Sequence, residues 1–135
     1  MRTSTAAILA AIALLATASS GFGAAKDYQF ELAGPSQNGG KGVSVVSVRL
    51  LHLPDERPVS GAIVIESRAD MGPIGMAGMS APVKSLPEQR AGSYRFEIQN
   101  GAVWKKAENW AVTLAAKVQG EPETVRGSIV VRLEP

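Results

Sequence analysis

Apolar and polar residues alternate with a two-residue period along most of the chain after its first 25 residues. In one clear example Tyr94, Phe96 and Ile98 share one side of an extended segment, and Arg95 and Glu97 share the other. An apolar residue at every second position is typical of a strand that buries one face. This pattern and β-branched runs predict strands over residues 28–32, 46–50, 62–67, 83–86, 92–99, 109–119 and 128–133.

Clusters of Gly, Pro, Asn and Asp separate these segments and predict the turns between them, for example at residues 34–40 and 120–122. No helical period of useful length competes with the strands. The pattern therefore predicts an all-β fold, an immunoglobulin-like antiparallel β-sandwich of about seven strands. The segment Gly92-Ser93-Tyr94 is also similar to the tyrosine corner of such sandwiches.

The first 25 residues have the pattern of a secretory signal peptide rather than of a folded segment. Met1 and Arg2 give a positive start, an apolar run covers residues 6–18, and small residues follow up to Ala25. The run is shorter than the roughly 20 residues that a membrane-spanning helix needs. We therefore expect a signal peptide over residues 1–25, a mature domain over residues 26–135, a periplasmic location, and no stable membrane insertion after cleavage.

The composition excludes several kinds of chemistry. The chain has no cysteine, one histidine and a formal net charge of +2. These counts exclude thiolate sites and multi-histidine zinc sites, and the weak charge bias argues against a nucleic-acid partner. No Ser/His/Asp order, phosphate-binding loop or carboxylate pair has a supporting context. We therefore expect a protein that is not an enzyme.

The methionines gather in one segment. Residues 69–82 are rich in Gly and Pro, which predicts a long irregular loop, and they contain Met71, Met76 and Met79. The fourth methionine of the chain is the initiator. Thioether sulfur is a soft ligand that favours Cu(I) or Ag(I) over Zn(II), Mg(II) or Ca(II). His52 would complete such a site only if the fold carries it to the loop.

Two other interpretations of the methionines remain open at this point. Methionine is a flexible apolar residue, so the three side chains could close one end of the sandwich, or they could form an adaptable surface for a protein partner. Trp104 or Trp110 could cover a bound metal ion by a cation–π contact, although the alternation around Trp110 favours a core position.

Three stretches resemble a known family: Asp70-Met71-Gly72-Pro73 with Met76 and Met79, Gly92-Ser93-Tyr94-Arg95-Phe96, and the segment 110–127 that begins Trp110-Ala111-Val112. Through them the chain from about Val59 to Leu133 resembles the YtkA-like/FixH family of small exported β-sandwich domains. The third stretch looks especially like members that are associated with heavy-metal efflux systems of Gram-negative bacteria.

One departure from the family affects the metal hypothesis. Relatives tend to carry Met-x-Gly-x-Trp before the long strand, whereas this chain has Lys106 in place of the methionine and Glu108 in place of the glycine. If that methionine is a ligand in relatives, this protein lacks it. The ammonium group of Lys106 would also disfavour a nearby metal ion.

The residues and the resemblance together lead to one expected function and one alternative. We expect a periplasmic, non-enzymatic accessory protein of heavy-metal, above all copper, handling or efflux. Its Met71, Met76 and Met79 would bind Cu(I) or Ag(I) weakly and exchangeably, with His52 as a further candidate ligand. The alternative is a periplasmic interaction module for a membrane transporter, an efflux protein or an oxidase-assembly complex, with the methionine segment as its contact surface.

Overall fold

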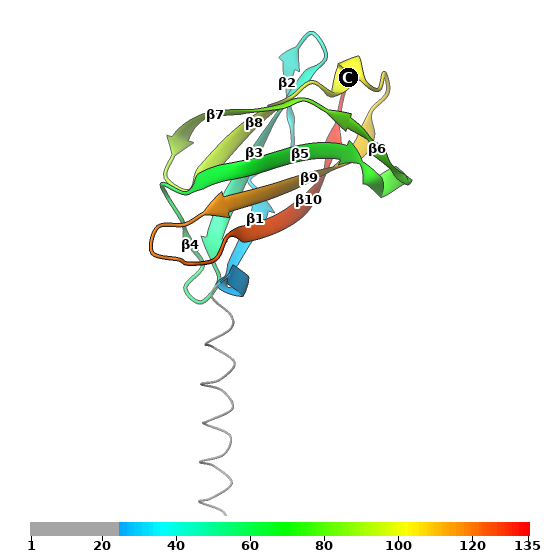
Figure 1. Cartoon of the computed structure of the whole chain (residues 1–135). Helices are drawn as coiled ribbons and strands as arrows, with labels where there is room; N and C mark the ends of the chain where they lie inside the picture. The colour runs from blue at the N-terminus through cyan, green and yellow to red at the C-terminus, as the bar shows by residue number, and fades with distance from the viewer. Residues whose placement is uncertain (1–24) are drawn as a thin grey trace, which may run out of the picture.

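The computed structural model describes residues 25–135, and the predicted signal peptide, apart from Ala25, lies outside them (Figure 1). The strands are β1 (Tyr28–Leu32), β2 (Gln37–Gly40), β3 (Val43–His52), β4 (Arg57–Pro58), β5 (Ile63–Met71), β6 (Met76–Ala81), β7 (Val83–Arg90), β8 (Ser93–Ile98), β9 (Glu108–Lys117) and β10 (Val125–Leu133). Three short 3₁₀ turns are η1 (Ala25–Asp27), η2 (Gly72–Ile74) and η3 (Asn100–Ala102). Across residues 25–135, no helix has the length and apolar character needed to cross a membrane.

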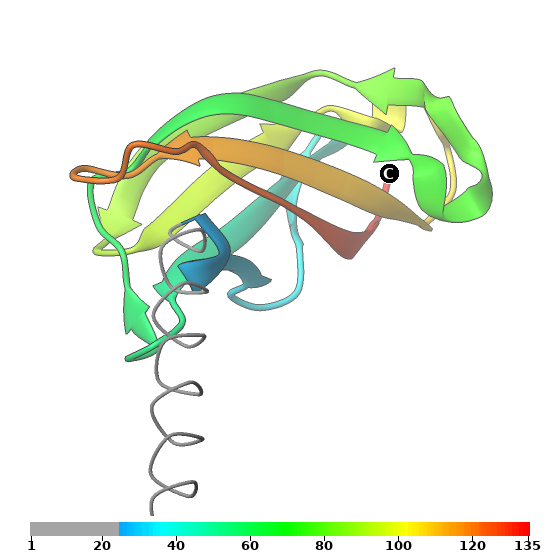
Figure 2. The same cartoon turned by 60° about the horizontal axis from the view of Figure 1, so that its bottom comes forward.

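The strands form two antiparallel sheets. Sheet A has the order β1-β3-β8-β7, with the short strands β2 and β4 also paired to β3, and sheet B has the order β10-β9-β5-β6. Figure 2 shows the sheet of β5, β9 and β10 lying over the sheet that contains β3 and β8. The predicted all-β sandwich is confirmed. The expected number of strands was too low because β2, β4 and β6 carry no clear apolar alternation.

The predicted alternating faces are the ones that form the core. Tyr94, Phe96 and Ile98 of β8 are buried, and Trp110 of β9 has no exposed surface. Other buried apolar residues of these two faces include Val46, Val48, Leu50, Val112, Leu114, Ala116, Val131 and Leu133. Because successive side chains of a strand point to opposite faces, the two-residue period was sufficient to identify them.

The two sides of the sandwich are closed differently. On one side β1 of sheet A packs against β10 of sheet B. Gly127 of β10 makes this possible, because a Cβ atom at that position would lie 2.9 Å from Cδ2 of Phe30. The missing side chain therefore gives the Phe30 ring its place across the seam between the sheets.

On the other side the sandwich is more open. Within residues 25–135, β6 pairs with β5 only from Ala69 to Met71, so the first half of β5 borders this side. Here the Tyr94 hydroxyl donates to the Val59 carbonyl at 2.6 Å and accepts the Ala62 N–H at 3.0 Å. These partners lie more than 30 residues upstream, whereas a tyrosine corner bonds to backbone only a few residues away. Tyr94 therefore joins sheet A to the β4–β5 connection and does not form the predicted tyrosine corner.

Candidate functional site

The three methionines lie on one β-hairpin rather than in an irregular loop. β5 continues to Met71, η2 makes the turn, and β6 returns from Met76, which pairs directly with Met71. The Asp70 carboxylate accepts the Gly72 N–H at 2.8 Å, and the Gly75 N–H donates to the Gly72 carbonyl at 2.8 Å. The prediction of an irregular segment over residues 69–82 was wrong because Gly72, Pro73 and Gly75 form a short turn, while Gly78 lies within β6 and Pro82 follows it.

A bulge in this hairpin brings Met76 and Met79 to the same face. Asp70 pairs with Ser80 while Met71 pairs with Met76, so residues 77–79 have no counterparts on β5. In a regular strand, residues three apart point to opposite faces. The bulge removes that constraint, and both Met76 and Met79 are half-buried against the core.

The three methionines differ in how accessible they are. Met71 has no exposed surface, whereas Met76 and Met79 are each partly exposed. Because Asp70 pairs with Ala111 of the neighbouring strand, Met71 lies beside Trp110 in the core. The hairpin thus presents two thioethers toward the surface and keeps the third behind them.

His52 lies at the other end of the sandwich. It ends β3, its Nδ1 lies 2.9 Å from Oδ1 of Asp55, and its ring centroid is 5.0 Å from that of Tyr28. The hydrogen bond to His52 lowers the pKa of Asp55. The start of β5, near Ile63, is at this end, and its eight steps to Met71 cover about 26 Å. Figure 1 likewise shows β4, which pairs with the end of β3, far from the hairpin, so the fold does not bring His52 to the methionines.

The two tryptophans lie near the β5–β6 hairpin, in different environments. Trp110 is a core residue of β9, as its alternation predicts. Trp104 is half-buried after η3, a turn that contacts β6, and its backbone N–H donates to the Asn100 carbonyl at 2.9 Å. Within residues 25–135, the indole Nε1 of each tryptophan is buried without a hydrogen-bond acceptor. A cation–π contact from Trp104 to a bound ion stays a prediction.

Asn100 positions this end of the fold, and sequence reasoning missed it. Its side chain is 1% exposed, and Nδ2 donates to the Glu134 carbonyl at 2.8 Å, which ties η3 to the end of the chain. Next to it, Gly101 donates its N–H to the Gly42 carbonyl at 2.8 Å, and a Cβ on Gly101 would lie 2.5 Å from Cα of Gly42. A single asparagine and two separate glycines give no pattern from which this contact could be predicted.

The β5–β6 hairpin carries three sulfurs and one carboxylate, Asp70, which already accepts the Gly72 N–H and pairs with Arg68. In the part of the chain that the structure describes, no three His, Cys, Asp or Glu side chains cluster in a way that could hold a metal ion. Lys105 donates to the Gly101 carbonyl at 2.7 Å, and with exposed Lys106 it lines a shallow hollow beside Trp104. A metal ion held by the three methionine sulfurs would have to be one that thioethers bind.

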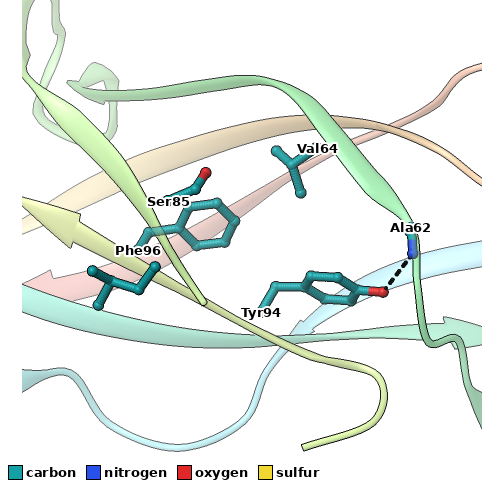
Figure 3. Close-up of a pocket in the computed structure, with 6 residues that line it drawn as sticks. Ala62, Val64, Ser85, Tyr94 and Phe96 are labelled. Atoms are coloured by element: carbon teal, nitrogen blue, oxygen red, sulfur yellow. Dashed lines mark hydrogen bonds between the residues drawn. The ribbon is translucent and has the colours of Figure 1, made fainter. Parts of the chain in front are cut away.

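A separate cavity of about 190 Å³ opens on the less closed side of the sandwich (Figure 3). It lies between β5, β7 and β8 and is lined by Ala62, Val64, Ser85, Leu86, Tyr94 and Phe96. None of these side chains ionises near neutral pH, and the Tyr94 hydroxyl is already bonded to the backbone of residues 59 and 62. The volume is below the roughly 300–1,000 Å³ that is usual for ligand pockets.

The fold and the site together define a small β-sandwich domain that carries its soft ligands on one terminal hairpin. A model of the YtkA-like family matches residues 23–101, more than half of the chain, and the chain belongs to the YtkA-like family. Comparisons with curated proteins and with solved structures find no match.

The family match overlaps only part of the resemblance found in the sequence. The stretch around Met71 and the stretch from Gly92 to Phe96 fall inside the matched range, whereas the stretch that begins at Trp110 lies beyond it. Membership of the YtkA-like family is confirmed. The likeness to members associated with heavy-metal efflux stays a prediction.

Proposed function

We propose that the protein is an exported, periplasmic and non-enzymatic accessory of heavy-metal handling or efflux, which binds Cu(I) or Ag(I) through its β5–β6 hairpin. The observation that carries this proposal is that Met71, Met76 and Met79 lie on one hairpin with two of them accessible. The predicted signal peptide supplies the location, and membership of the YtkA-like family is consistent with an exported domain.

In the proposed site, the two accessible methionines bind and release the metal ion. Met76 and Met79 lie on the bulged strand, so small changes in their side-chain rotamers would turn both sulfurs toward a bound ion. Met71 stands behind them and would add a third sulfur only if the hairpin opens slightly. A few neutral thioethers, in a chain without cysteine thiolates, favour weak binding and rapid transfer to a partner.

A competition titration with a chromophoric Cu(I) chelator tests the proposal. We expect about one ion per chain for the unaltered protein, and clear losses for Met76→Ala and Met79→Ala. Ile74→Ala is the matched control, because Ile74 is an exposed apolar residue (37%) of the same turn and carries no sulfur. Cu(I) uptake no greater than the chelator background would refute the metal site.

The alternative function is a protein-interaction module for a membrane transporter or an oxidase-assembly complex. The exposed Ile74 beside half-buried Met76 and Met79 favours it, because these residues form an apolar tip on the hairpin. If this alternative is correct, partner capture should persist in metal-free medium and should weaken when Met76 and Met79 are replaced by glutamine. Partner capture that is unchanged in these two variants would count against the interaction-module hypothesis.

A further inference from the structure

A second hollow lies on the solvent-facing side of sheet A, away from the core. Its volume is about 260 Å³, and it is lined by Ala33, Gln37, Ser47, Arg90, Ser93 and Arg95. Strand pairing explains why these residues meet. Ser47 of β3 pairs with Arg95 of β8, and Arg90 at the end of β7 pairs with Ser93.

The hollow contains two arginines, Arg90 and Arg95, without a carboxylate partner among the described residues. Elsewhere Arg49 pairs with Glu31, Arg68 with Asp70, and Arg126 with Glu66. Among residues 25–135 as described, neither Arg90 nor Arg95 forms an ion pair, and Nε of Arg95 is buried without an acceptor. A buried donor that lacks an acceptor is costly, and more so when it belongs to a charged group.

Two acidic side chains of sheet A that the structure describes, Glu31 and Glu97, have other positions. Glu31 accepts from Arg49, and Glu97 lies one row further along β8, directly opposite Lys84 of β7. The lining that remains offers two guanidinium groups, two serine hydroxyls and one amide, all of which can donate hydrogen bonds. The hollow therefore has the positive charge and the donors that an anionic oxygen group requires.

We propose that this hollow binds a small, freely diffusing oxyanion of the phosphate type. The anion accepts from the guanidinium groups of Arg95 and Arg90, and the hydroxyls of Ser47 and Ser93 complete its surroundings. Its binding would offset the repulsion between the two like charges, and a turn of the Arg95 side chain would bring the buried Nε–H to the anion. The volume is smaller than that of usual pockets for drug-sized ligands, which favours a small ion. The site is independent of the methionine hairpin, because it lies on the other sheet.

Titration of the purified protein with inorganic phosphate at constant ionic strength tests this site. The arginine Nε–H signals in NMR spectra report on binding, and calorimetry gives the affinity. We expect saturable shifts of the Arg95 signal, and an affinity about tenfold or more lower in Arg95→Gln and in Arg90→Gln. Arg126→Gln is the matched control, because it removes an exposed arginine from sheet B that already has a carboxylate partner.

Two results would overturn the proposal. The first is a phosphate response that equals the response to chloride, or that survives in both Arg90→Gln and Arg95→Gln. The second is binding of an acidic peptide at the same residues without binding of free phosphate, which would make the hollow a peptide contact. If Arg95→Gln does not fold, the Arg90→Gln variant, which changes an exposed residue, still tests whether the hollow binds phosphate.

Discussion

Replacement of Met71 by alanine is expected to destabilise the fold strongly, whereas replacement by leucine is not. The Met71 side chain has no exposed surface. Alanine removes three heavy atoms, and at about 0.8 kcal/mol for each the loss is about 2.4 kcal/mol. Incomplete closure of the resulting cavity raises the expected loss to about 3 kcal/mol. Leucine nearly preserves the volume and should cost less than about 1.5 kcal/mol.

Urea unfolding of the wild-type protein and the two variants measures these changes, and equal m values would show that the denatured states are comparable. In a domain of this size, a loss of about 3 kcal/mol should lower Tm by about 10–15 °C. Met71→Leu also removes the sulfur, so its Cu(I) affinity separates packing from ligation. A loss below about 1 kcal/mol for Met71→Ala, or equal losses for both variants, would refute the reasoning from burial.

Three further predictions concern residues away from the hairpin. Gly127→Ala would place Cβ 2.9 Å from Cδ2 of Phe30, so we expect a loss of about 1–3 kcal/mol in urea unfolding; an unchanged midpoint would contradict close packing at the seam. Tyr94→Phe removes a hydroxyl that serves two backbone groups, which should cost about 1–3 kcal/mol. A cost near zero would mean that water replaces the hydroxyl. The pKa of Asp55 lies below its ordinary value of 3.8 through its bond to His52, so its stabilising effect is present above pH 3.8 and is lost as the pH falls through the folded-state pKa. NMR titration of His52→Ala should show the Asp55 pKa rising toward 3.8, and an unchanged pKa would contradict the assigned cause.

The sandwich could be predicted because its main strands bury one face each. Tyr94, Phe96 and Ile98 alternate with polar residues, and all three are buried as that alternation requires. Trp110 follows the same rule in β9. The short strands escaped prediction because β2 consists of Gln, Asn and two glycines, and β4 of Arg and Pro.

The candidate metal site could be predicted only in part. Met71, Met76 and Met79 are near neighbours in the chain, so their proximity needed no knowledge of the fold. Their unequal burial depends on the bulge in β6 and on contacts with β9, which are distant in sequence. The separation of His52 from them depends in the same way on the order of the strands.

The oxyanion site had no local signal at all. Arg95 and Ser47 are brought together by the pairing of β3 with β8, and Arg90 joins them from the end of β7. In the sequence, each arginine looks like an ordinary solvent-facing residue of a strand. Only the described structure shows that Nε of Arg95 is buried and lacks an acceptor.

The graded exposure of the methionines also sets the order in which they would react with oxidants. Met76 and Met79 are partly exposed and would form sulfoxides first, whereas Met71 is shielded until the hairpin opens. A sulfoxide is polar and no longer a thioether, so the hairpin would lose its soft ligands and its apolar tip while the core methionine and the fold persist. Enzymatic reduction of the sulfoxides would restore both, so oxidation of this hairpin would suspend the proposed function reversibly.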